Sequence, residues 1–345
     1  MIHILMNDLL TTSLYKYHQE HKAKMIEFAG WHMPFSYEGT IKEHNYVRTE
    51  SGFFDVSHMG RIYIENNEIE NVNKLICSDL IKLKNTKAMY SIFTNAEGNA
   101  LDDVIFWKFE THIILICNAI NRDKITTHLT NNEISYKDIT FETSLIAIQG
   151  PQSIELLKTL LEIPEKFSTN KNNTFTYART GYTGEDGLEI MYENIHTDQV
   201  LNFLIENNIK PCGLGSRDTL RLEASLPLYG FELTEKISPV EANLKWVINN
   251  DDNYLGKKII DRHIETGDHK YLKKFILESK RIPRTGTVVK SNNVSGVVTS
   301  GNYSPILEKS IGFVLLDSLP ETDLLEFDIR GNLLEGQIIY KRFLS

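Results

Sequence analysis

The strongest constraint on the fold is the order of strand-like and helix-like segments, because the same alternation of strands and helices occurs twice along the chain. The first pass predicts a helix over residues 7–22, strands over 61–65, 89–95, 103–109 and 111–117, and a helix over 121–131. The second predicts a strand over 145–149, a helix opened by Gly150-Pro151, strands over 174–179 and 187–192, a helix over 197–207, and a helix capped by Ser216 that runs to about Ser225. Two α+β units with antiparallel sheets are therefore expected.

The last part of the chain follows a different pattern. After one more predicted helix, over 256–265, short strands alternate with Gly and Pro turns from Phe275 to Phe343, and no helical period occurs. This pattern predicts a small all-β domain of the barrel type. The polar cluster Asn249–Asn253 is the expected linker before it.

Composition excludes several classes of protein. The 345 residues include 46 acidic and 37 basic side chains, so the chain lacks the basic excess typical of nucleic-acid-binding proteins. The longest apolar run, from Ile113 to Cys117, is far too short for a transmembrane helix. The N-terminal stretch Met1–Leu10 has no basic lead-in and no small-residue cleavage site, so we expect no targeting signal and a cytoplasmic location.

Cysteine and histidine positions argue against metal or disulfide stabilisation. The three cysteines, Cys77, Cys117 and Cys212, are widely spaced and form no Cys-x-x-Cys motif. No two of the eleven histidines are four residues apart. We therefore expect no metal site and no disulfide framework.

Two motifs contain carboxylates that are candidates for catalysis or ligand binding. In Leu101–Trp107, strand alternation places Asp103, Ile105 and Trp107 on one face and Asp102 on the other, so one carboxylate would point inward beside aromatic surface. In Gly181–Ile190, three glycines permit a tight loop, and Glu189 follows on a strand. Each has an ordinary alternative: an Asp pair that ends a turn, and a glycine-rich hairpin with an exposed Glu.

Two further segments carry candidate polar groups. Ser57 and His58 are neighbours in Phe54–Gly60, which is not a nucleophile–base arrangement, so serine-hydrolase chemistry is not expected. The segment Gly213–Asp218 opens a predicted helix, and Arg217 with the helix N-terminus could hold an anion such as a carboxylate.

Taken in order, these motifs resemble the aminomethyltransferase family of the glycine cleavage system, the T-proteins. The resemblance covers nearly the whole chain. It rests on these collinear segments: Gly30-Trp31, Met33-Pro34, Phe54–Gly60, Tyr90-Ser91, Asp102-Asp103, Gln149–Pro151, Gly181–Glu189, Cys212–Asp218, Arg221–Ala224, Leu228–Gly230 and Thr299–Pro305.

The resemblance implies a fold of class α+β with three domains. Two interleaved ferredoxin-like α+β domains would form a folate cavity, and a C-terminal all-β barrel-like domain would follow. The implied boundaries are 1–52 with 143–248 for the first domain, 53–142 for the second, 249–268 for a linker and helix, and 269–345 for the barrel.

The resemblance also implies roles for individual residues. Asp103 would be the catalytic carboxylate beside the N5/N10 edge of tetrahydrofolate, and Glu189 would bind the pterin ring. Arg217 would contact the folate as well. The remaining folate-binding positions implied by the family are Tyr182, Tyr90, Asn118, Met59 and Trp107, where Trp107 stands at a position that is Tyr in some relatives.

The implied reaction takes an aminomethyl group from the dihydrolipoyl arm of the H-protein, releases ammonia and passes the methylene to tetrahydrofolate. Tetrahydrofolate is then a co-substrate, and no metal, nucleic acid or membrane takes part. Two alternatives remain: a folate-binding iron–sulfur maturation protein of the same fold, whose Lys-Gly-Cys-Tyr segment is missing here, and a non-catalytic folate-binding module. The sequence leaves the oligomeric state open, with a monomer as the working assumption.

One charged segment suggests where the H-protein docks. From His269 to Lys290 there are seven basic residues and one acidic residue, Glu278. The segment is either a solvated strand surface or a docking surface for the H-protein, which is usually acidic in this family.

Overall fold

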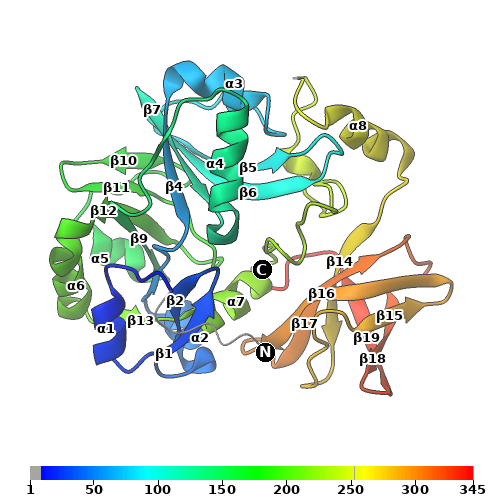
Figure 1. The fold of residues 1–345 in the computed structure, drawn as a ribbon. Coiled ribbons are helices and arrows are strands. Elements are labelled where there is room, and N and C mark those ends of the chain that lie inside the picture. The colour runs from blue at the N-terminus through cyan, green and yellow to red at the C-terminus, as the bar shows by residue number, and fades with distance from the viewer. Residues whose placement is uncertain (1–8, 252, 345) are drawn as a thin grey trace. The chain divides into compact units, whose positions relative to one another are not determined.

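The computed structural model describes residues 9–251 and 253–344, and Figure 1 shows their ribbon. Contacts within the chain divide it into two compact units. The first unit contains the residues up to Glu68, Leu83–Met89 and Ile105–Asp218; the second contains Ile69–Lys82, Tyr90–Val104 and the residues from Thr219 onward. The three domains implied by the resemblance remain a prediction.

The first unit is built on a six-stranded sheet in the order β10-β11-β12-β9-β3-β13. These strands are β3 (Gly52–Asp55), β9 (Thr143–Gln149), β10 (Thr169–Lys171), β11 (Phe175–Ala178), β12 (Gly187–Glu193) and β13 (Lys210–Pro211). The helices of the unit are α1 (Tyr15–Glu20), α2 (Thr40–Thr49), α4 (Arg122–Asn131), α5 (Ser153–Leu157) and α6 (Thr197–Glu206). Residues Leu14 and Tyr17, Leu157, and Val200 with Leu204 join one apolar core with the sheet, so α1, α5 and α6 pack on it.

A hairpin and a second sheet complete this part of the chain. Strands β1 (Lys24–Phe28) and β2 (Trp31–Ser36) pair antiparallel. A five-stranded sheet has the order β5-β6-β7-β4-β8, with strands β4 (Gly60–Glu65), β5 (Ala88–Thr94), β6 (Ala100–Lys108), β7 (His112–Cys117) and β8 (Lys137–Asp138). The boundary between the two units runs through β5, β6 and helix α7 (Leu214–Glu223).

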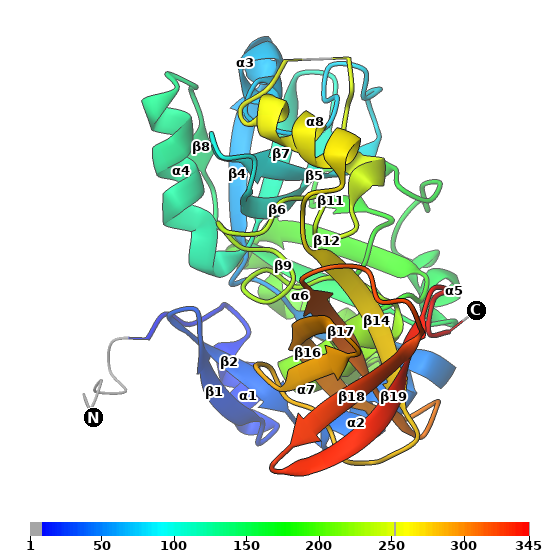
Figure 2. The ribbon, with the colours of Figure 1, turned by 90° about the vertical axis from the view of Figure 1, so that its right-hand side faces the viewer.

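The second unit ends in a closed barrel, with strand order β14-β17-β16-β15-β18-β19. Its strands are β14 (Tyr271–Leu277), β15 (Val288–Ser291), β16 (Val294–Ser304), β17 (Lys309–Leu316), β18 (Leu324–Ile329) and β19 (Asn332–Ile339). Strands β18 and β19 form the long hairpin drawn in red in Figure 2. Its two-residue turn, Arg330-Gly331, has positive φ at both positions, as a type I′ turn requires.

The rest of the second unit forms a separate apolar cluster. Helix α8 (Lys257–Thr266) and the short helix η5 (Lys245–Val247) contribute to it, and helix α3 (Ile69–Asn73) also belongs to this unit. Ile92, Ala100, Leu244 and Ile260 are among the buried residues of this cluster. The mixed α+β architecture with a C-terminal barrel, expected from the sequence, is confirmed.

Most predicted elements form within a few residues of their expected positions, but two predictions were wrong. The helix expected over 7–22 is limited to Tyr15–Glu20, because the Leu10 backbone bonds to Gly30 and His32 instead; residues 7 and 8 lie outside the described part. Ser216 does not cap α7 but lies inside it, and its hydroxyl donates back to the Gly213 carbonyl. The expected linker includes residue 252, which is also outside the described part.

Candidate active site

Glu189, on β12, is a buried carboxylate and not an exposed residue of a hairpin. Its side chain is only 5% exposed, and its Oε2 accepts a hydrogen bond of 2.6 Å from the Thr180 hydroxyl. Ala178 of β11 and Ala147 of β9 flank it in the sheet. The two small neighbours leave the carboxylate room on this face, and one oxygen is engaged by Thr180. The arrangement suits a carboxylate that binds a ligand's N–H groups.

Arg217, on α7, lies over aromatic rings of the same unit. Its guanidinium carbon is 5.0 Å from the centre of the Tyr182 ring and 5.8 Å from that of Phe54. Burial lowers the pKa of Arg217, while the charge of Glu189 acts in the opposite direction. The Nη1 atom has no hydrogen-bond partner among the described residues. Such a guanidinium combines a planar stacking surface with N–H donors that are available to a ligand.

Asp103 is paired with a tyrosine in the second unit. The Tyr90 hydroxyl donates a hydrogen bond of 3.1 Å to Asp103 Oδ2. The Tyr90 ring stacks on the indole of Trp246, with centroids 5.8 Å apart, and the Trp246 side chain is 72% exposed. The second unit therefore presents a carboxylate, a phenol and an open aromatic surface together.

The two carboxylates of Asp102-Asp103 have opposite environments. Asp102 is fully buried, together with Ala100, Val104 and Phe106 on one face of β6. Asp103 is on the less buried face. The sequence prediction placed the inward carboxylate on the face of Asp103 and Trp107, whereas the buried carboxylate of the pair is Asp102, on the opposite face, and Asp103 is half-buried.

Three other predicted folate residues are positioned in the first unit. Trp107 is completely buried, and its indole Nε1 has no hydrogen-bond partner in the described residues. Met59 and Asn118 are half-buried, directly before β4 and directly after β7. Their role in folate binding stays a prediction.

The segment around Ser57 and His58 forms no serine triad. The Ser57 hydroxyl exchanges hydrogen bonds with the backbone of Leu145. Burial lowers the pKa of His58 to about 4, so its imidazole is neutral at pH 7. The buried histidine that contacts an aspartate is instead His18, whose Nε2 is 2.8 Å from Asp55.

Two residues outside the predicted ligand set contact predicted ligand residues, one in each unit. Phe54 shares Arg217 with Tyr182, and Trp246 covers Tyr90. Phe54 is the first residue of the Phe54–Gly60 motif. Strand alternation relative to its neighbour Asp55 could therefore have predicted the face on which its side chain lies. Trp246 stands in no periodic pattern, and its sequence signal is limited to a bulky aromatic residue between polar segments.

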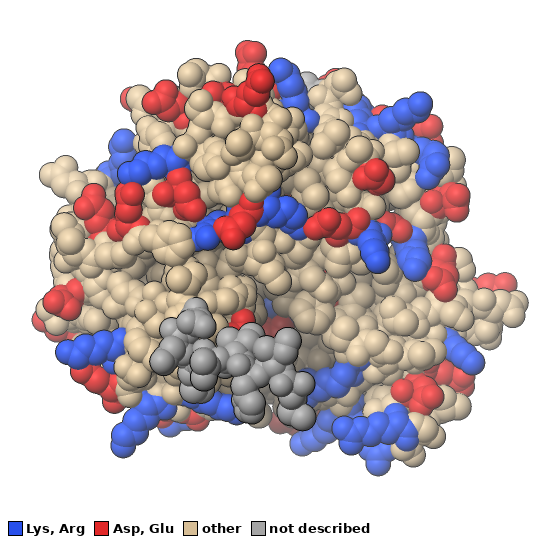
Figure 3. All heavy atoms as spheres, in the orientation of Figure 1, with Lys and Arg blue, Asp and Glu red and all other residues tan. Residues whose placement is uncertain are grey.

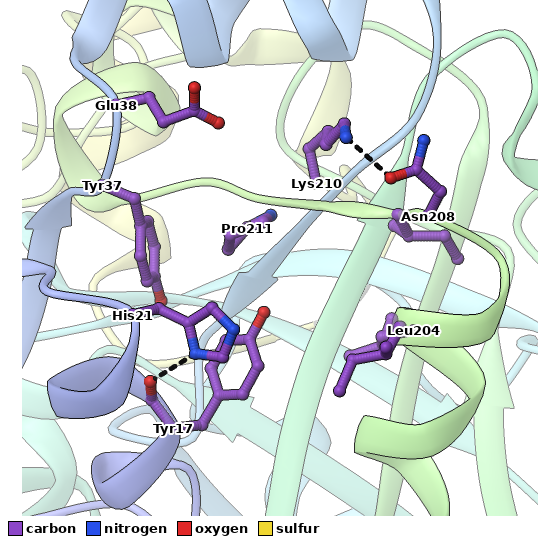
Figure 4. A pocket seen from close by; sticks show the side chains of 10 residues that line it. Tyr17, His21, Tyr37, Glu38, Leu204, Asn208, Lys210 and Pro211 are labelled. Carbon is purple, nitrogen blue, oxygen red and sulfur yellow. Dashed lines mark hydrogen bonds between the residues drawn. The ribbon is translucent and has the colours of Figure 1, made fainter.

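The pocket shown in Figure 4 is separate from these groups. It has a volume of about 280 Å³ and lies in the first unit, between α1, α6 and β13. Its walls include Tyr17, His21, Tyr37 and Pro211, and Lys210 bonds to Asn208 at one side. None of the predicted folate residues lines it.

The basic residues of His269–Lys290 do not form one continuous patch. Lys273 shares the face of β14 that carries the barrel-core residues Phe275 and Leu277, whereas Lys274 is on the other face. Lys273 Nζ lies over the Tyr271 and Tyr340 rings, and burial lowers the pKa of both lysines. The exposed basic residues of the segment are Lys270, Lys280, Arg281, Arg284 and Lys290. Figure 3 shows Lys and Arg interspersed with Asp and Glu over the face in view.

The described residues contain neither a membrane-spanning helix nor a metal-binding cluster. No helix in residues 9–251 and 253–344 is long and apolar enough to cross a membrane. Within the same residues, no group of three or more His, Cys, Asp or Glu side chains is arranged to hold a metal ion.

Comparison with known proteins defines the class. Residues 14–252 match the GCVT N-terminal domain, and residues 270–344 match the glycine cleavage T-protein C-terminal barrel domain. The chain is 38% identical to an aminomethyltransferase from Thermoanaerobacter pseudethanolicus, with 98% of each chain covered. It is 36% identical to one from Alkaliphilus oremlandii, with 99% of each covered. A crystal structure of glycine cleavage system aminomethyltransferase T from Bartonella henselae matches with a TM-score of 0.91 and 28% identity, over 97% of this chain and 98% of that one.

The fold and these full-length matches define a transferase that handles one-carbon units. The chain belongs to the glycine cleavage T-protein family, as the resemblance in its sequence implied. The alternative of an iron–sulfur maturation protein is not favoured.

Proposed function

We propose that this chain catalyses aminomethyl transfer between the H-protein of the glycine cleavage system and tetrahydrofolate. The observation that carries the proposal is its full-length membership of the aminomethyltransferase family. The carboxylate, guanidinium and aromatic groups described above supply the chemistry that such a reaction needs.

The reaction balances without an enzyme nucleophile or an oxidant. The aminomethyl carbon loses its bonds to the lipoyl sulfur and to the amino nitrogen, and it gains bonds to N5 and N10 of tetrahydrofolate. The two protons released from N5 and N10 are taken up by the departing thiolate and the departing amine. The products are the dihydrolipoyl H-protein, ammonia and 5,10-methylenetetrahydrofolate.

In the first unit, Glu189 and Arg217 are proposed to bind the folate. The pterin carries a row of N–H donors, which the buried Glu189 carboxylate can accept. Arg217, with its unpartnered Nη1, offers donors to ligand oxygen or nitrogen acceptors. Tyr182 adds an aromatic surface beside the guanidinium. A pterin needs this combination of acceptor, donor and ring surface.

In the second unit, Asp103 is proposed to act on the reacting atoms. An iminium-like methylene carries positive charge, which a nearby carboxylate stabilises electrostatically. The same carboxylate can orient the amine of the folate that attacks this carbon. Its hydrogen bond from Tyr90 fixes the carboxylate direction before the substrate arrives.

The test is steady-state ammonia release by the purified full-length chain. Aminomethylated H-protein and tetrahydrofolate are supplied together and separately. We expect rapid release only when both are present, together with formation of methylenetetrahydrofolate. Binding of tetrahydrofolate without turnover would identify the chain as a non-catalytic folate-binding module and would overturn the proposal.

A further inference from the structure

Glu43, on α2, is a fully buried carboxylate that none of the site assignments uses. It is 0% exposed, and it lies in the same unit as Arg217. Its Oε1 accepts three backbone N–H groups at 2.7–2.9 Å, from Tyr37, Glu38 and Gly39. Its Oε2 accepts the Gly213 N–H at 2.7 Å, and the Ser216 hydroxyl, which donates to the Gly213 carbonyl, lies 3.4 Å away. One side chain therefore joins the loop before α2 to the start of α7.

The start of α7 is also held by close packing. A Cβ atom added at Gly213 would lie 2.3 Å from the backbone carbonyl of Phe35. At Gly215 it would lie 2.6 Å from Thr40 Oγ1 and 2.9 Å from the Phe35 ring. Only glycine permits these approaches, so the backbone of the first turn is pressed against β2 and α2. The Glu43 hydrogen bonds therefore hold a segment, the start of α7, that close packing against β2 and α2 already restricts.

Arg217 belongs to this same turn. Its backbone N–H donates to the Gly213 carbonyl at 3.2 Å. The Gly213 N–H is the group that Glu43 holds, so Glu43 is linked to Arg217 through one residue, Gly213, directly before the helix. A displacement of this turn would move the guanidinium away from Tyr182 and Phe54.

We propose that Glu43 is a positioning residue for the ligand site: it fixes the first turn of α7 and so sets the Arg217 guanidinium in place for the folate. The assignment of folate to Arg217 rests on the proposed function. The carboxylate matters because both of its oxygens must accept hydrogen bonds, and four backbone N–H donors converge on them. A glutamine of the same size offers one accepting oxygen, and its NH₂ group would face N–H donors.

The test compares Glu43→Gln with a matched control, Glu27→Gln. Glu27 also accepts a backbone N–H in the first unit, from Gly30 at 2.9 Å, but it does not touch α7. Tetrahydrofolate affinity is measured by titration of the full chain, in the wild-type background and in an Arg217→Ala background. We expect Glu43→Gln to weaken binding about tenfold in the wild-type background and less than about twofold when Arg217 is absent. Glu27→Gln should leave the affinity unchanged.

An equal loss of affinity in both backgrounds would overturn the proposal, because Glu43 would then act on the fold in general. Unchanged affinity in the wild-type background would overturn it as well. Amide hydrogen exchange of residues 213–220 in the ligand-free chain provides a second readout that does not depend on folate. We expect this segment to exchange about tenfold faster in Glu43→Gln than in Glu27→Gln. If the wild-type chain binds no folate, the proposed function fails, whereas an unchanged exchange rate would contradict the positioning role itself.

Discussion

The Tyr90 hydroxyl donates a 3.1 Å hydrogen bond to the Asp103 carboxylate, in the second unit of the chain. The hydroxyl donor orients the carboxylate and carries no charge itself. A carboxylate held in this way is suited to electrostatic stabilisation of a cationic reaction centre.

Asp103→Asn tests this role. The substitution preserves volume and hydrogen bonding while it removes the charge, so we expect the fold and much of the folate affinity to survive. Turnover should fall by about 10²–10⁴-fold, the usual contribution of such a group. Tyr90→Phe, which removes only the orienting hydroxyl, should reduce kcat by a smaller factor. If Asp103→Asn keeps more than half of the wild-type kcat, Asp103 has no part in the mechanism.

Glu189→Ala tests the proposed pterin contact. The change leaves N–H groups of the bound ligand without an acceptor, which should cost about 1–3 kcal/mol of binding free energy. Thr180→Val is the matched control, because it removes the hydroxyl that bonds to Glu189 and keeps the carboxylate. We expect the dissociation constant of tetrahydrofolate to rise in the first variant and to change little in the second. An unchanged constant in Glu189→Ala would place the pterin elsewhere.

The elements of the fold were largely predictable from local patterns. Strand β6 forms as alternation around Asp103 predicts, because adjacent strands satisfy its backbone and its side chains alternate between two faces. The helix predicted over residues 7–22 is shorter than expected, because the Leu10 backbone forms hydrogen bonds with Gly30 and His32. A local hydrophobic period does not reveal such distant partners.

The site was only partly predictable for the same physical reason. Glu189 and Asp103 were predicted from family motifs, but those motifs did not identify what surrounds them. Trp246 covers Tyr90 across a long stretch of sequence, and Glu43 bonds to Gly213 across 170 positions. Such pairs depend on tertiary packing, which periodicity does not report.

The shifted pKa of the Asp55 carboxyl predicts how the free energy of unfolding depends on pH. Burial raises its pKa, but hydrogen bonds from His18, Thr12 and Ser57 outweigh that effect and hold the pKa at about 2. The pKa is lower in the folded state, so the stabilisation is present above about pH 4 and is lost as the pH falls towards 2. Asp55→Asn should therefore lower the free energy of unfolding by roughly 2 kcal/mol near pH 7.

Chemical denaturation at several pH values provides the measurement. The difference between the wild-type chain and Asp55→Asn should shrink as the pH falls from about 4 to 2. A difference that stays constant over this range would show that the Asp55 charge does not contribute to stability.

The basic segment predicts how the H-protein docks. If exposed cations of this segment attract an acidic partner, KM for the H-protein should rise several-fold with added salt, whereas KM for tetrahydrofolate changes less. Because Lys273 and Lys274 are half-buried on opposite faces of β14, the informative variant reverses the exposed charges Lys280, Arg281 and Arg284. It should reproduce the high-salt KM at low salt.

The matched control reverses three exposed lysines of the first unit, Lys16, Lys137 and Lys158. It changes the net charge by the same amount and should leave KM for the H-protein nearly unchanged. If both triple variants raise KM equally, only net charge matters, and the basic segment is not the docking surface.

The most direct test of the account is a single turnover with H-protein that carries a ¹³C-labelled aminomethyl group. We expect the label to appear in 5,10-methylenetetrahydrofolate, one ammonia to be released for each labelled methylene, and Asp103→Asn to slow both by the same factor. Ammonia release at an equal rate without tetrahydrofolate, with the label lost as formaldehyde, would contradict this account.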